Sequence, residues 1–344
     1  MAPTSDIYST HIITQMTHPA TAKGRILAVL AALAALWFGT AHAAEHKLNV
    51  VTTVAPLTNI VANVAGSYAR VEGIIPEGVD SHTFEPVPSN AKLLSDADVI
   101  FVNGLHLETL IIKLAEKVKQ ASTPIVHLGA HTISKDEWRY DFSFPKARGN
   151  PNPHLWMDVA FAQRFAEITR NTLARLDPPH KDGYYANTTA YLARLSKLDA
   201  AMFDCVASIP AKNRKLVTYH DSFAYFSPRY GMKVIAAIQP SDFSEPRPQD
   251  VVAIIKQLRR EKVPAIFGSV VFPSKVLEEI SKESGTKYVN QLEDDELPGD
   301  IGQPSHTYMG MMARDMGIIA GALGGDGQCM AHIDVTNLAS QGVN

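Results

Sequence analysis

Short apolar runs alternate with helical segments along most of the chain, and this alternation restricts the folds that the chain can adopt. The run at residues 97–102 ends in four consecutive apolar residues, as expected of a strand that is covered on both faces. Stretches such as residues 107–119 and 248–260 have apolar residues at helical spacing. Strands that alternate with helices predict an α/β fold whose sheets are mostly parallel.

The alternation occurs twice, on either side of a long amphipathic stretch at residues 182–206 that contains no proline. A helix without proline has no ready point at which to kink. We therefore expect two lobes, each a four-stranded, mostly parallel sheet flanked by helices, joined by one long rigid helix. The expected division places the first lobe at residues 44–178, the linker helix at 179–207 and the second lobe at 208–344.

The first 43 residues have the features of an export signal. Positive charge precedes an apolar run at residues 26–38, which is too short to span a bilayer comfortably, and Ala41-His42-Ala43 is a small-residue cleavage site. We expect cleavage after Ala43, with translation starting at Met1 or Met16. No cysteine lies at the cleavage site, so a lipid anchor is not expected there and the mature protein is placed in the periplasm.

Charge and cysteine content narrow the possibilities further. The formal net charge is −3 over 344 residues and no basic patch stands out, so nucleic acid is not an expected partner. The two cysteines, Cys205 and Cys329, would meet an oxidising environment after export, where an even count favours a disulfide. The alternative is a pair of buried free thiols.

Possible metal ligands follow the expected strands in both halves of the chain. His82 comes after the strand at residues 71–75, and His220 directly follows the strand ending at Tyr219. His154 lies in a stiff, proline-rich loop just ahead of a helix, and an acidic run, Glu293-Asp294-Asp295-Glu296, follows a further strand. The carboxyl ends of parallel strands line a ligand crevice, and imidazole and carboxylate groups suit zinc and similar metals. We expect each lobe to bring two ligands to one buried ion.

Three motifs resemble those of the zinc/manganese solute-binding proteins of ABC importers. They are Ser81-His82-Thr83-Phe84-Glu85-Pro86, Asn152-Pro153-His154-Leu155-Trp156-Met157-Asp158, and His220-Asp221-Ser222-Phe223-Ala224-Tyr225-Phe226 followed by Tyr230-Gly231. The resemblance runs from Leu48 to about Leu323 and implies two α/β lobes joined by one long helix. It also implies that His82, His154 and His220 are metal ligands. The fourth ligand in the family is an aspartate, for which Asp295 is the best match and Asp294 the alternative.

Two departures from the family pattern bear on the metal. The connection at residues 130–153 contains a single histidine, His131, so capture of metal by a histidine-rich loop is not expected. Ser269 stands where many members have glutamate at the end of a strand, which would remove one carboxylate from the surroundings of the site. Three imidazoles and one carboxylate favour zinc, with manganese next and ferrous iron third.

The resemblance implies a periplasmic, high-affinity zinc-binding protein that delivers zinc to the membrane permease of an ABC importer. We expect a monomer without catalytic activity, with a periplasmic metallochaperone as an optional further partner. The rival hypothesis is a periplasmic zinc hydrolase with Glu85 or Asp221 as the base. That enzyme would need one coordination position left open for water.

Overall fold

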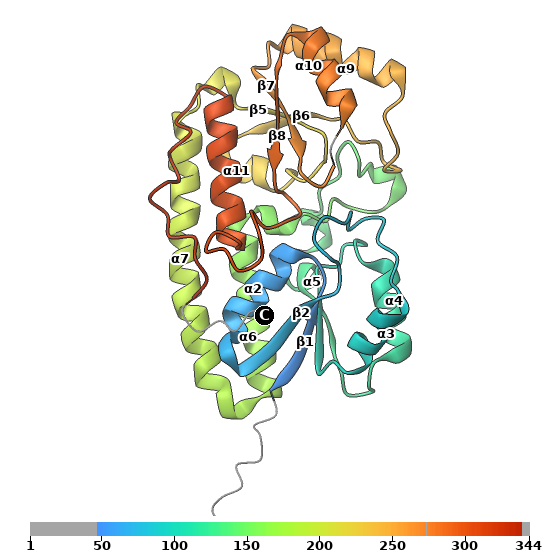
Figure 1. Cartoon of the computed structure of the whole chain (residues 1–344), viewed down its shortest axis with the longest axis vertical. Helices are drawn as coiled ribbons and strands as arrows, with labels where there is room; N and C mark the ends of the chain where they lie inside the picture. The colour runs from blue at the N-terminus through green and yellow to red at the C-terminus, as the bar shows by residue number, and fades with distance from the viewer. Residues whose placement is uncertain (1–46, 273, 339–344) are drawn as a thin grey trace, which may run out of the picture. The chain divides into compact units, whose positions relative to one another are not determined.

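The computed structural model of the protein describes residues 47–272 and 274–338, and it contains two four-stranded sheets (Figure 1). The strand orders are β2-β1-β3-β4 and β6-β5-β7-β8, so both sheets have the same topology, and all paired strands are parallel. The expected two-lobed α/β fold is therefore confirmed. The strands are β1 (Leu48–Thr52), β2 (Ala69–Gly73), β3 (Val99–Val102), β4 (Ile125–His127), β5 (Lys215–Thr218), β6 (Lys233–Ala237), β7 (Ala265–Ser269) and β8 (Lys287–Leu292).

Helices follow most of the strands, and several begin where the sequence signals a start. Pro248 opens one helix, and the Asp158 carboxylate accepts a hydrogen bond from the Ala160 amide at the start of another, as expected of an N-cap. The helices are α2 (Ala55–Ala65), α3 (Pro88–Ser95), α4 (Thr109–Val118), α5 (Leu128–Thr132), α6 (Val159–Leu176), α7 (Lys181–Ser208), α8 (Phe226–Tyr230), α9 (Pro248–Glu261), α10 (Lys275–Ser284) and α11 (Tyr308–Ala322).

Several strand boundaries differ from expectation by one or two residues. Strand β2 begins at Ala69 rather than at residue 71, because its pairing with β1 starts at Leu48 opposite Ala69. The strand expected ahead of the acidic run is β8, which extends to Leu292 because it remains paired with β7 up to Ser269. The end of β8 therefore lies directly before the acidic run, which contributes to the site.

The long helix α7 spans 28 residues and packs against α2, α6 and α11 (Figure 1). Gly183 in its first turn lies against the ring of Tyr68, where an added Cβ would come within 2.3 Å of the ring carbon Cε2. A larger residue would push the start of the helix away from the first lobe. None of the helices within residues 47–272 and 274–338 is long and apolar enough to cross a membrane. The expected signal peptide at residues 1–43 lies outside the described residues.

The described chain continues beyond the second lobe. After α11 it continues along α7 as residues 324–338, which we call the C-terminal strap and which contacts α7 at Arg194, Cys205 and Ser208. A disulfide between Cys205 in α7 and Cys329 ties the strap to the linker helix, with the two Cα atoms 5.3 Å apart. Farther along, the Asn337 side chain accepts a 2.8 Å hydrogen bond from Asn63 of α2. The disulfide expected from the cysteine count is present, and the strap is a second connection that reaches the first lobe.

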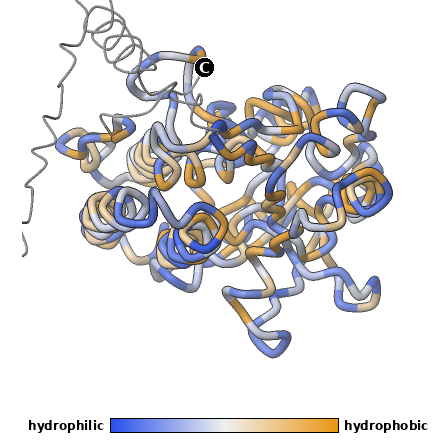
Figure 2. Tube along the Cα trace, turned by 90° about the horizontal axis from the view of Figure 1, so that it is seen from below, coloured by the Kyte–Doolittle hydropathy of each residue, from blue (hydrophilic) through white to orange (hydrophobic). Residues whose placement is uncertain are grey.

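One hydrophobic core runs through both lobes and the linker helix. A smaller apolar cluster lies between the second sheet and the helices α9 and α10. In a view turned by 90°, many helices carry hydrophobic residues along one side and hydrophilic residues along the other (Figure 2). This is the amphipathic pattern from which the helices were expected.

Candidate metal centre

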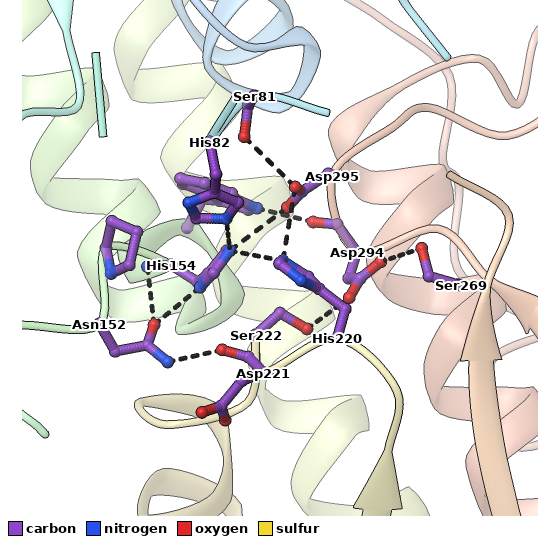
Figure 3. A network of polar contacts seen from close by, with 12 residues as sticks. Ser81, His82, Asn152, His154, His220, Asp221, Ser222, Ser269, Asp294 and Asp295 are labelled. Carbon is purple, nitrogen blue, oxygen red and sulfur yellow. Dashed lines mark hydrogen bonds and ion pairs between the residues drawn. The ribbon is translucent and has the colours of Figure 1, made fainter. Parts of the chain in front are cut away.

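Four side chains from both lobes converge on one point (Figure 3). They are His82, His154, His220 and Asp295, and their candidate ligand atoms all lie within 4.8 Å of one another. The Nε2 atom of His154 is 3.2 Å from that of His82 and 2.9 Å from that of His220. The Asp295 carboxylate lies 3.6 Å from His154 Nε2 and 3.5 Å from His220 Nε2. The structure thus brings together the three motif histidines and Asp295.

These separations match the size of a coordination shell. Two ligands about 2.0–2.1 Å from a tetrahedral zinc ion lie roughly 3.3–3.4 Å apart. The closest pairs at the site, at 2.9 to 3.6 Å, fall around that value. Three nitrogen atoms and one carboxylate are therefore spaced as donors around a single divalent cation.

The ring of His154 is held in the tautomer that a metal requires. Its Nδ1 atom lies 2.7 Å from Asn152 Oδ1, which can only accept, so Nδ1 carries the hydrogen and Nε2 presents its lone pair to the cluster. The other end of the same amide donates a 2.6 Å hydrogen bond to the backbone oxygen of Asp221 in the second lobe. Asn152 therefore orients a ligand and contacts the opposite lobe at the same time.

His220 is oriented in the same way by a residue far from it in sequence. Its Nδ1 atom donates to Gln239 Oε1 at 2.7 Å, which again leaves Nε2 free to bind metal. Gln239 belongs to no motif and follows strand β6. Only the parallel pairing of β6 with β5 places it beside His220, so no local pattern in the sequence could point to it.

Burial sets the protonation of the histidines. Burial, together with the nearby His220, lowers the pKa of His82 and of His154 well below the ordinary value, so both are neutral at neutral pH. Burial also lowers the pKa of His220, but the carboxylates of Asp295 and Asp294 raise it by more, for a net increase. Neutral imidazole is the form that binds metal, so two of the three rings are prepared for it.

The Asp295 carboxylate is buried, and its hydrogen bonds are too few to stabilise a negative charge there. Burial raises the pKa of its carboxyl to about 7. Oxygen Oδ2 accepts a long, 3.4 Å hydrogen bond from the Ser81 hydroxyl, whereas the buried Oδ1 has no hydrogen-bond partner. An unsatisfied buried carboxylate oxygen is costly, and a cation placed between Asp295 and the histidines would offset that cost.

The neighbouring Asp294 lies outside the cluster and holds the acidic turn in place. Its two carboxylate oxygens accept hydrogen bonds from Ser222 at 2.5 Å and from Ser269 at 2.7 Å (Figure 3). Its backbone oxygen accepts a 2.8 Å hydrogen bond from the indole of Trp156. Asp294 thus fixes the acidic turn from behind while Asp295 enters the cluster. Ser269 supplies a donor here, so its departure from the family pattern provides a hydrogen bond to Asp294.

Two aromatic rings shield the cluster on the side of His82. The ring of Phe243 stacks on His82 at 4.7 Å between centroids, and Phe144 lies 5.5 Å from it. A cavity of about 430 Å³ opens beside these three residues. Leu105 and His106 also line the cavity, and together with Phe243 they have positive φ angles of 53°, 71° and 58°. Strained backbone of this kind gathers at functional sites.

Other residues that the sequence raised as ligands or bases lie outside the cluster. Glu85 is exposed, and so is His131 of the connection at residues 130–153. Asp221 is fully buried, but its Oδ2 atom accepts a 2.8 Å hydrogen bond from the Ser143 amide. Burial, followed by the adjacent Asp141, raises the pKa of Asp221 well above its ordinary value, which keeps a proton on this pair of acids.

Two α/β lobes that supply three histidines and one aspartate, all but His82 buried, define a metal-binding protein of the two-lobed solute-binding class. The sequence matches the family described as zinc-uptake complex component A, periplasmic, over residues 50–322. The chain belongs to this family.

Individual relatives of the chain also bind metals, according to their names. The iron-binding protein YfeA of Yersinia pestis is 32% identical over 278 residues, covering 81% of this chain and 87% of that protein. The manganese ABC transporter substrate-binding lipoprotein PsaA of Streptococcus pneumoniae is 30% identical over 314 residues, covering 87% and 99%. The structure of the periplasmic zinc-binding protein TroA from Treponema pallidum superposes with a TM-score of 0.74 at 30% identity, covering 81% of this chain and 99% of that chain.

The protein is therefore the metal-binding, substrate-binding component of an ABC importer, as the motifs implied. Such components work with a membrane permease and an ATPase, and the family consists of transport proteins rather than enzymes. The three relatives are named for three different metals. The comparisons give no support to the expected metallochaperone.

Proposed function

We propose that the protein binds one zinc ion per chain through His82, His154, His220 and Asp295 and delivers it to the permease of an ABC importer. The observation that carries this proposal is the convergence of three imidazole Nε2 atoms and one carboxylate within 4.8 Å. The ion is cargo, so the site must hold it tightly and later release it. The protein acts as a monomer.

The donor set is the reason for preferring zinc. Three neutral nitrogen donors and one carboxylate complete a tetrahedral shell, which zinc accepts and manganese does not favour. Within the described residues, no other histidine, cysteine or acidic side chain joins this group to raise the coordination number. Manganese and iron are the alternatives, because relatives are named for them.

A competition between metals tests the proposal. We expect metal-free protein given equimolar zinc, manganese and ferrous iron under anaerobic conditions to retain one zinc per chain, measured by elemental analysis after gel filtration. Because N/O sites generally bind zinc more tightly than manganese, uptake in cells is the stricter measurement. A strain lacking the protein should grow poorly under zinc limitation and recover with added zinc. Recovery with manganese or iron alone would assign the cargo to that metal.

Metal affinity should fall steeply with acidity below pH 7. Binding requires a deprotonated Asp295 and a neutral His220, and the pKa of Asp295 is about 7 while that of His220 is raised. Each proton that the metal displaces weakens the apparent association constant about tenfold per pH unit below the relevant pKa. His82 and His154 do not contribute in this range, because their pKa values are lowered. Titrations with a chromogenic chelator at pH 8, 7 and 6 measure the slope, and a flat profile would contradict it.

The proposal includes the periplasmic location of the protein and the division of its chain into two lobes and a linker helix. We place the mature protein in the periplasm on the strength of the export signal expected at residues 1–43, with cleavage after Ala43. The same division assigns the first lobe to residues 44–178, the linker helix to 179–207 and the second lobe to 208–344. Export to that compartment agrees with a disulfide between Cys205 and Cys329.

A further inference from the structure

The segment at residues 139–148 belongs to the first lobe in sequence, yet its polar contacts reach the second lobe. The Ser143 amide donates to Asp221 Oδ2 at 2.8 Å, and the Ser143 hydroxyl donates to the Gln239 backbone oxygen at 2.6 Å. Arg148 donates to the Ser241 backbone oxygen at 2.9 Å. Ser143 is only 2% exposed, so both of its hydrogen bonds are shielded from water.

The two residues that Ser143 contacts are those that hold His220. Asp221 is its neighbour in the chain, and Gln239 accepts the hydrogen from its Nδ1 atom. The reverse link exists as well, because Asn152 orients His154 from the first lobe and donates to the Asp221 backbone oxygen in the second. The group that orients each of these two histidines is thus hydrogen-bonded to the opposite lobe (Figure 3 shows the Asn152 link).

We propose that Ser143 is a positioning residue which couples the retention of the metal to contact between the two lobes. This inference rests on the proposed function, since it concerns the same site. While the lobes are in contact, Ser143 holds Gln239 and Asp221 in place, and His220 keeps its Nε2 atom aimed at the cluster. When the segment leaves the second lobe, both hydrogen bonds are lost together and His220 is no longer held in the ligand geometry.

The same segment also covers the site. Phe144, the residue after Ser143, lies 5.5 Å from the ring of His82 and 5.8 Å from that of His154. It lines the cavity beside His82, as does Ser143. Movement of this one segment would therefore loosen a ligand and uncover the cluster in a single step, so the rate of metal release should depend on it more than the rate of capture.

The variant Ser143→Ala tests this coupling. We expect it to release metal about tenfold faster than the natural protein while its association rate changes by less than about twofold, since a buried hydrogen bond is lost from the closed state only. Release is followed by stopped-flow absorbance after mixing zinc-loaded protein with excess chromogenic chelator, and capture by the reverse mixing.

Ser281→Ala, at a half-buried position, is the control for a hydroxyl–backbone hydrogen bond within one lobe. The Ser281 hydroxyl also donates to a backbone oxygen at 2.6 Å, that of Thr286, but both residues lie in the second lobe. A purely structural loss would affect the two variants alike in thermal stability and in release. Equal release rates for Ser143→Ala and Ser281→Ala would overturn the inference while leaving the proposed function intact. Failure of the natural protein to bind zinc at one per chain would overturn both.

Hydrogen exchange in the natural protein provides a measurement that does not depend on a variant. The Ser143 amide should be protected with zinc bound and should exchange at least about tenfold faster after its removal. The Ser134 amide, which donates to Glu137 at 2.9 Å within the first lobe, should change little. Unchanged exchange at residues 139–148 on removal of zinc would count against the coupling.

Discussion

Replacement of His154 by alanine should weaken zinc binding more than about 100-fold, beyond the range seen when residues behind a ligand are changed. His154 is fully buried, and its Nε2 atom lies within 3.6 Å of a donor atom from each of the other three residues. Removing it opens the centre of the donor set, and the cavity left behind cannot restore a nitrogen donor. A competition titration with a chromogenic chelator gives the dissociation constant directly.

His131→Ala is the control for this loss, because His131 is exposed and lies outside the cluster. The same titration distinguishes the two neighbouring acids. Asp295→Asn should lose most of the affinity, whereas Asp294→Asn should retain more of it, since Asp294 contacts Ser222 and Ser269 rather than the histidines. Similar losses for His154→Ala and His131→Ala would remove the basis of the ligand assignment.

Reduction of the disulfide should cost the protein roughly 4–5 kcal/mol of unfolding free energy. Cys205 and Cys329 are separated by 124 residues, and a cross-link over so long a loop removes much entropy from the unfolded chain. The loss should appear as a lower denaturation midpoint with little change in the zinc affinity, because neither cysteine belongs to the metal cluster. Urea unfolding with and without a phosphine reductant, in metal-free protein, measures it.

Cys329→Ser separates this effect from any other action of the reductant. Cys329 is only half-buried, so serine replaces it with little loss of packing. The variant should unfold at the midpoint of the reduced natural protein, and the reductant should not shift it further. A reductant effect of the same size on the variant would show that the cross-link is not the cause.

Much of the fold and of the candidate site could be predicted because the relevant signals are local. Strand β3 is indicated by four consecutive apolar residues, and the start of α6 by the capping residue Asp158. Both signals involve only residues that are close together in the chain. Each of the three histidine motifs is also a short continuous stretch. The ligand roles in the family could therefore be assigned to His82, His154 and His220 one by one. Asp295 could be ranked above Asp294 only by the family pattern, and in the structure it is the Asp295 carboxylate that lies in the group of candidate ligands.

The surroundings of the ligands could not be predicted from the sequence, because they are built between distant segments. Ser143 and Gln239 are ordinary polar residues 96 positions apart, and nothing local pairs them. The hydrogen bond from Ser269 to Asp294 could not be predicted for the same reason, since Asp294 is 25 positions away and follows the neighbouring strand β8. Such hydrogen bonds follow from the register of parallel strands and from the approach of the two lobes.

The C-terminal strap connects the two lobes a second time, in addition to the linker helix, because it follows the second lobe in sequence and contacts the first lobe in space. Asn59 and Asn63 of α2 are buried in the first lobe, and both donate hydrogen bonds to Asn337, near the end of the described chain. A chimera that joins the first lobe of this protein to the second lobe of a relative, cut at α7, would leave those two amides facing a foreign strap. The first lobe and the strap therefore form one unit in space although they are far apart in sequence. In a chimera, the first lobe should be exchanged together with the strap.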